Sequence, residues 1–178
     1  KTARRRDTDI HFWNYNEVKD AGITDYMKVL QKDFLPEDFR TELKDNKVDG
    51  VIAVQADQSD NETTFLLGLA KNNPWIKGVV AWVDLKDENI EDKFFGYSVH
   101  PIIKGFRHIV QGQPEGFLRN NKFLNGIKLL KHFGFTYDIL IYQNQMKEAI
   151  EFVNKFPGQK FIIDHCTKPI TKDKKIHE

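Results

Sequence analysis

Reactive side chains recur in this sequence directly after short apolar segments. They are Asp9 and His11, Gln55, Trp82 and Asp84, Arg107 and His108, and Asp164 and His165. Carboxylates and imidazoles can transfer protons or ligate a metal ion, and the planar guanidinium of arginine suits a carboxylate or a polarised carbonyl. These residue types indicate acid–base or metal chemistry, provided that the fold brings them together.

Asp9 and His11 are two residues apart, so on a strand both side chains point to the same face and could reach one ion or one substrate. The pair alone is not a metal site, because a catalytic zinc usually has three protein ligands. A purely structural role is the alternative for each of these groups. Asp9 and His11 could simply end a surface strand, Arg107 could form a salt bridge at a rim, and His165 could cap a loop.

The elements that must position these groups alternate along the chain. Apolar, β-branched runs predict strands at 48–55, 76–83, 102–107, 137–141 and 160–164, with a weaker strand at 8–12. Helical patterns separate them. Pro36 suits the first position of a helix, and Ser59 and Glu62 have capping-box spacing before a helix at 63–72. A short helix is predicted at 89–95. Apolar residues at helical spacing begin at Phe123 and end before Gly134, and a further helix is predicted at 146–153. Strand–helix alternation of this kind predicts parallel βαβ units.

An open doubly wound sheet and a barrel both give this alternation. In a parallel barrel the carboxyl ends of all strands meet on one face, whereas an open sheet gathers ligands mainly at a switch point. Polar groups after nearly every strand favour the barrel. We therefore expect an α/β fold, an incomplete TIM (β/α)8 barrel of about six βα units, forming one truncated domain over residues 1–178.

Composition narrows the class of protein. The chain has 178 residues, with 27 Lys and Arg against 26 Asp and Glu, so its net charge of +1 gives no electrostatic reason to expect nucleic acid as a partner. No apolar run approaches the roughly 20 residues that span a bilayer, so we expect no membrane partner. One cysteine and no visible signal peptide suggest a cytoplasmic protein. No P-loop or Gly-rich dinucleotide motif supports an open-sheet nucleotide enzyme.

The segment Asp7-Thr8-Asp9-Ile10-His11-Phe12-Trp13 resembles the opening D-x-H-x-H-F-W of the amidohydrolase-related, TIM-barrel metal-dependent hydrolases. This branch includes L-fuconolactonase, L-rhamnonolactonase and 2-pyrone-4,6-dicarboxylate lactonase. Further matching segments follow in the family's order: LPED at 35–38, VDG at 48–50, GVVAWVD at 78–84, KGFRH at 104–108 and FIIDH at 161–165, with Lys168-Pro169.

The resemblance implies a hydrolase that opens lactones of sugar acids at the carboxyl face of the barrel. It implies catalytic roles for His11, Arg107 and His165, and contacts to a small-molecule lactone or sugar acid from Gln55, Trp82, His108 and Trp13. Asp9, His11 and His165 would be the ligands of one divalent ion such as Zn²⁺, which some members bind and others work without.

Two departures keep an alternative open. Asp9 stands where the family has its first histidine, and the family's last catalytic carboxylate, on strand eight, would lie beyond Glu178. The alternative is a non-catalytic carbohydrate-binding or interaction protein on a degenerate hydrolase barrel. In that case Trp13, Trp82 and Tyr142 would stack on sugar faces.

Overall fold

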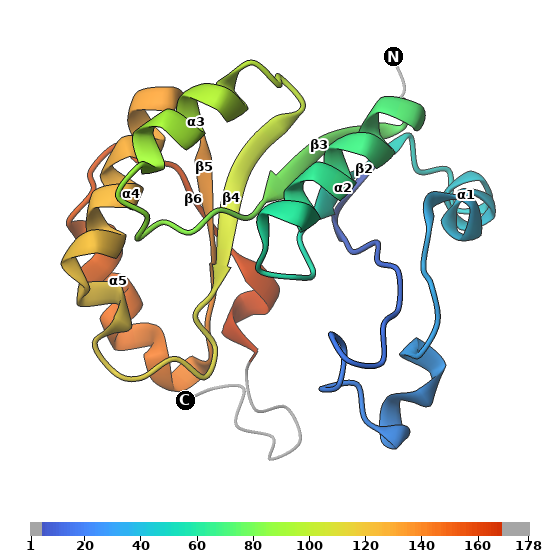
Figure 1. The fold of residues 1–178 in the computed structure, drawn as a ribbon, viewed down its shortest axis with the longest axis horizontal. Helices are drawn as coiled ribbons and strands as arrows, with labels where there is room; N and C mark the ends of the chain where they lie inside the picture. Colours follow the sequence, from blue (N-terminus) through green and yellow to red (C-terminus); the bar gives the residue numbers. More distant parts are fainter. Residues whose placement is uncertain (1–4, 169–178) are drawn as a thin grey trace.

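The strands form one curled parallel sheet with helices on its outer side (Figure 1). This computed structural model describes residues 5–168. The sheet contains six strands in sequential order, each parallel to its neighbours. A sheet that adds each strand beside the last has no switch point, as in a barrel. The strands are β1 (Arg6–Ile10), β2 (Gly50–Val54), β3 (Ile76–Ala81), β4 (Ile103–Ile109), β5 (Thr136–Leu140) and β6 (Phe161–Ile163).

This architecture is a partial TIM barrel, and it confirms the predicted fold and all the predicted strands. The predicted helices are present too. They are α1 (Pro36–Asp45), α2 (Asp60–Asn72), α3 (Ile90–Ser98), α4 (Asn121–Phe133) and α5 (Met146–Asn154).

The helix boundaries follow from short polar contacts. Ser59 Oγ accepts a hydrogen bond from the backbone N–H of Glu62 at 3.2 Å and so caps α2. The second half of the expected capping box differs, because the Glu62 carboxylate accepts from the N–H of Ala56 at 2.8 Å. Helix α4 ends at Gly134, whose φ of +76° is a left-handed conformation that glycine adopts without a steric penalty.

The core fills the space between the sheet and the helices, where most large apolar side chains are buried. Phe94 of α3 packs on Phe106 of β4 with ring centroids 5.2 Å apart. Helix α4 meets the segment after β3 at Gly126, where a Cβ atom would collide with the carbonyl oxygen of Leu85. These contacts hold β3, β4 and β5 in place, and β4 carries Arg107 at the centre of the site.

The segment between β1 and α1 folds in a way that the sequence did not predict. Trp13 and Phe34 form an antiparallel bridge, with N–H to carbonyl distances of 3.0 and 2.9 Å. Their rings lie 4.4 Å apart. The bridge closes the base of a long loop that contains a 3-10 helix, Asp25–Leu30.

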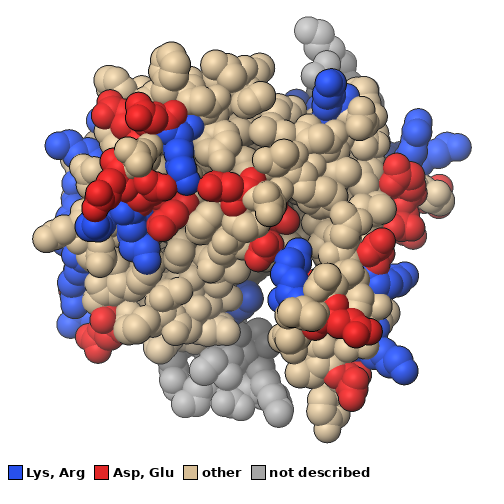
Figure 2. All heavy atoms as spheres, viewed as in Figure 1, with Lys and Arg blue, Asp and Glu red and all other residues tan. Residues whose placement is uncertain are grey.

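Acidic and basic side chains lie interspersed on the surface shown in Figure 2, which has no extended patch of a single charge. In the part of the chain that the structure describes, no helix combines the length and the apolar character needed to cross a membrane.

Candidate active site

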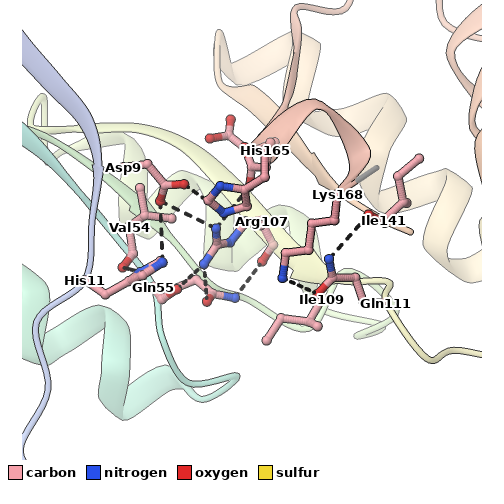
Figure 3. Close-up of polar contacts among 12 residues, drawn as sticks. Asp9, His11, Val54, Gln55, Arg107, Ile109, Gln111, Ile141, His165 and Lys168 are labelled. Atoms are coloured by element: carbon pink, nitrogen blue, oxygen red, sulfur yellow. Dashed lines mark hydrogen bonds and ion pairs between the residues drawn. The ribbon is translucent and has the colours of Figure 1, made fainter. Parts of the chain in front are cut away.

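Arg107, near the carboxyl end of β4, lies at the centre of a polar cluster on the concave side of the sheet (Figure 3). Its Nη1 is 3.0 Å from Asp164 Oδ2 and 3.8 Å from Asp9 Oδ1. Its Nη2 donates to the backbone carbonyl and, at 3.2 Å, to the side-chain Oε1 of Gln55. A buried guanidinium held by three residues cannot change its orientation freely, so the position of its positive charge and the directions of its N–H groups are fixed.

The carboxylate of Asp9 contacts two histidines that follow the two edge strands of the sheet. Its Oδ1 lies 3.5 Å from His11 Nε2, and its Oδ2 lies 3.1 Å from His165 Nε2. Asp9 and His11 come from β1 and the residues after it, whereas His165 follows β6. The curl of the sheet is therefore what brings these groups together.

His11 is held as a neutral ring. Its Nδ1 lies 2.9 Å from the carbonyl oxygen of Val54, which can only accept, so Nδ1 carries the proton and Nε2 keeps its lone pair. Burial lowers the pKa of His11, and the charge of Arg107 adds to the effect, while the Val54 contact and Asp9 oppose it. The lone pair of Nε2 therefore faces a carboxylate oxygen of Asp9, and this pair can take up one proton.

The turn that carries His165 is left-handed over four successive residues that are not glycine. Their φ angles are +48° at His165, +49° at Cys166, +63° at Thr167 and +50° at Lys168. Such angles are unfavourable for L-amino acids and are found most often at functional sites. Lys168 Nζ donates to Gln111 Oε1 at 3.1 Å, so the far end of this turn is anchored to the segment after β4.

Two buried carboxyl groups face the same space. Burial raises the pKa of Asp164, and Arg107 opposes that rise. Burial, and then the charge of Asp164, raises the pKa of Asp138 to about 7. Asp138, Asp164, Asp9 and His165 all line one cavity of about 500 Å³ on the concave side. A cluster of groups with shifted pKa values beside a fixed cation is typical of an acid–base site.

Sequence analysis did not identify Asp138, although the sequence carried a signal. A charged residue interrupts the apolar strand at 136–140, and burying a carboxyl group there is costly unless it has a role or a partner.

Of the predicted site residues, Asp9, His11, Gln55, Arg107 and His165 are brought together. The structure does not bring His108 to this cluster. Successive residues of a strand point to opposite faces, so Arg107 faces the polar cluster on the concave side while His108 stacks on Phe117, with ring centroids 5.0 Å apart.

The two predicted tryptophans are not among the residues that line the cavity on the concave side. Trp13 packs on Phe34 as described above. The backbone of Trp82 exchanges hydrogen bonds with Thr63 Oγ1, at 2.6 and 3.1 Å. Within residues 5–168 neither indole N–H has a hydrogen-bond partner. Their roles in substrate binding remain predictions.

Asp9, His11 and His165 have the donor chemistry of a zinc site, but in this structure they pair with one another. Asp9 contacts each imidazole through a different carboxylate oxygen, and Arg107 places a cation beside it. Among the described residues, no three His, Cys, Asp or Glu side chains are grouped so that they could hold a metal ion. The geometry therefore gives no support to the predicted three-ligand metal site.

The family model described as Amidohydrolase matches residues 7–177. The chain belongs to the amidohydrolase family. This amidohydrolase is 30% identical to an L-fucono-1,5-lactonase of Burkholderia multivorans over 169 residues, which is 94% of this chain and 57% of that protein. An L-rhamnono-gamma-lactonase of Scheffersomyces stipitis is 33% identical over 73 residues, 38% of this chain and 22% of its own length.

Solved structures agree with this assignment. A crystal structure of an amidohydrolase from Burkholderia multivorans with bound zinc superposes with a TM-score of 0.90 and 30% identity, over 94% of this chain and 59% of that one. A probable 2-pyrone-4,6-dicarboxylic acid hydrolase from Acinetobacter baumannii shares the fold, with a TM-score of 0.74, 12% identity and coverage of 93% and 59%.

The chain thus spans a little under 60% of the length of the relatives that it matches over nearly its whole length. Lactonases among these relatives support the predicted hydrolase class, and the comparisons give no support to the non-catalytic alternative.

Proposed function

We propose that this protein hydrolyses lactones of sugar acids at the polar cluster around Arg107. One observation carries the proposal. A buried guanidinium, fixed by Gln55 and Asp164, lies beside an Asp9 carboxylate that contacts two imidazoles. A fixed cation next to a proton acceptor is what ester hydrolysis requires, because negative charge develops on the carbonyl oxygen while water loses a proton. The lactonases among the relatives support the substrate class.

Arg107 would polarise the lactone carbonyl and stabilise the oxyanion that forms on it. The guanidinium group of Arg107 is already oriented before the substrate binds, so little reorganisation is needed during the reaction. The side-chain amide of Gln55 holds the same guanidinium, and we assign Gln55 to orienting Arg107 and the substrate.

His165 would take the proton from water. Its Nε2 lies 3.1 Å from Asp9 Oδ2, so Asp9 accepts from Nε2–H and leaves Nδ1 free as the base. With 42% of its side chain exposed, His165 can meet water at the mouth of the site. His11 contacts the other oxygen of Asp9 and keeps that carboxylate in position.

Water oxygen bonds to the carbonyl carbon while His165 accepts its proton, and the resulting oxyanion lies against Arg107. Collapse of this intermediate breaks the ring C–O bond, and His165 returns the proton to the departing oxygen, which becomes a hydroxyl group. The new carboxylic acid ionises at neutral pH and releases one proton to solvent.

No step in this scheme passes through a metal ion. Binding of one divalent ion such as Zn²⁺ by Asp9, His11 and His165 remains a prediction, which the metal content of the purified full-length protein tests. Stoichiometric zinc that is lost in both His11→Asn and His165→Asn would support it, and zinc-free wild-type protein would reject it.

The test of function is proton release during hydrolysis of a panel of aldonolactones by the full-length protein. We expect Arg107→Ala and His165→Ala to lose at least 100-fold in kcat/KM, in line with loss of an oxyanion donor or a general base. His132→Ala, on the exposed side of α4, is the matched control and should match wild type. Unchanged rates in both site variants would reject the assigned roles.

A further inference from the structure

Asp138 lies between the two residues that form the central ion pair. Strand β5 runs between β4 and β6, and the Cα of Asp138 pairs with that of Arg107 on one side and that of Ile162 on the other. Asp164 is two residues beyond Ile162. Because Arg107 and Asp138 are partners in register and side chains alternate along a strand, both point to the concave face of the sheet. The carboxyl group of Asp138 there lines the same cavity as Asp164.

The carboxyl group of Asp138 is buried and is not in contact with a cation among the described residues. The residue is 4% exposed, and its one hydrogen bond in the described part of the chain is a long one, 3.5 Å from Thr136 Oγ1 to Asp138 Oδ1. No ion pair within 4 Å reaches it among these residues. The charged or titratable groups that line the same cavity are Lys104 of β4, Asp9 of β1, and Asp164 and His165 after β6. The charges that act on Asp138 are those of Asp164, Arg107 and Asp9.

The charges in this space explain why a neutral Asp138 matters. With Asp138 ionised, three carboxylates would share the one guanidinium of Arg107. A buried carboxylate without its own partner is costly, so it would compete for Arg107 with Asp164 and Asp9. With Asp138 protonated, Arg107 keeps its contacts to Asp164 and Gln55.

We propose that Asp138 is a positioning residue, whose neutral acid leaves Arg107 directed at Asp164 and the reacting carbonyl, and whose ionisation draws Arg107 away from them. The proposal rests on the proposed function as far as the carbonyl is concerned. The position of Arg107 can be measured without any substrate.

The first test is the Arg107 Nε–H signal in ¹⁵N NMR spectra of the full-length protein, assigned with Arg107→Lys. In wild type the signal should shift as pH rises through about 7, the pKa of Asp138. In Asp138→Asn, which mimics the neutral acid, the signal should stay at its low-pH position. Asp92→Asn, on the exposed side of α3, is the matched control and should shift as wild type does. A wild-type signal that does not respond to pH, or one that responds equally in Asp138→Asn, overturns the proposal.

The second test is the pH profile of lactone hydrolysis. Wild-type kcat should fall about tenfold for each pH unit above 7, while Asp138→Asn should keep the low-pH kcat, within about twofold, across that range. A folded Asp138→Asn that shows the wild-type alkaline fall, or that loses activity at every pH, contradicts the positioning role. If neither protein hydrolyses any lactone but the NMR shift occurs as expected, the proposed function fails while the link between Asp138 and Arg107 holds.

Discussion

Arg107 Nη1 lies 3.0 Å from Asp164 Oδ2, and the two side chains are only 3% and 7% exposed. The pair links β4 to the end of β6 across the intervening strand β5. Burial raises the pKa of Asp164, and the guanidinium opposes that rise. Each member of the pair therefore compensates the buried charge of the other.

Removal of one member should be more damaging than removal of both. Arg107→Met leaves an unpaired buried carboxylate and should lower the free energy of unfolding by about 3–5 kcal/mol. The double variant Arg107→Met with Asp164→Leu should recover part of that loss, because no charge is left without a partner. Urea unfolding of the two variants and wild type measures both effects. Equal losses in the single and double variants would show that the pair does not balance charge.

His108 should make the protein less stable at acid pH. The ring is 6% exposed, neither ring nitrogen has a partner in the described structure, and burial lowers its pKa to about 4. The unfolded chain binds a proton near pH 6.5 and the folded chain does not, so stability is lost as pH falls from about 6.5 to 4. A pKa difference of about 2.5 units, at 1.4 kcal/mol for each unit, amounts to about 3.5 kcal/mol, most of which is lost over this range.

Comparison of wild type with His108→Phe checks this effect. Phenylalanine keeps the stacking on Phe117 but cannot titrate. The difference in unfolding free energy should move in favour of the variant as pH falls through this range. A difference that stays constant with pH would mean that His108 is protonated equally in both states.

Asp138 should have the opposite dependence on pH. The pKa of Asp138 is about 7 in the folded chain against its ordinary value of 3.8, so the folded state binds the additional proton between these values. Stability attributable to this group therefore falls as pH rises from about 4 to 7. Denaturation of Asp138→Asn and wild type at several pH values should show the variant gaining roughly 3–4 kcal/mol over that range. If the advantage of Asp138→Asn over wild type in unfolding free energy became smaller with rising pH, the raised pKa would be contradicted.

Gly126 and Gly68 should respond in opposite ways to alanine. A Cβ at Gly126 would collide with the Leu85 carbonyl, so Gly126→Ala must push α4 off the segment after β3 and should cost about 1–3 kcal/mol. Gly68 in α2 has no atom within 4 Å of such a Cβ, so Gly68→Ala should gain about 0.5–1 kcal/mol from helix propensity. Thermal melts of the two variants test the packing, and a neutral Gly126→Ala would show that α4 is not held there.

The strands and the identity of the fold could be predicted from the sequence because local patterns determine them. Continuous β-branched runs indicate strands buried on both faces, and polar residues at their carboxyl ends indicate a shared face. That Asp9, His11, Gln55, Arg107 and His165 lie close together could be predicted in this way. The distances among them could not be, because they depend on how strongly the sheet curls between β1 and β6.

The other differences between the predicted and the observed structure also have physical causes. His108 directly follows Arg107, and the alternation of a strand already implies that both cannot face one cavity. Asp138 lies inside a strand, whereas the polar residues that indicate a shared face are those at the carboxyl ends of strands. The Trp13–Phe34 bridge joins residues about 20 positions apart, with no periodic pattern to reveal it.

The most direct test of the account is a crystal structure of the full-length protein with a sugar lactam, an analogue of a lactone that resists hydrolysis. The account predicts the lactam carbonyl oxygen about 3 Å from the Arg107 guanidinium, with His165 facing the carbonyl carbon across one water molecule. A lactam bound with its carbonyl directed away from Arg107, or bound outside the cluster of Asp9, His11 and His165, would contradict it.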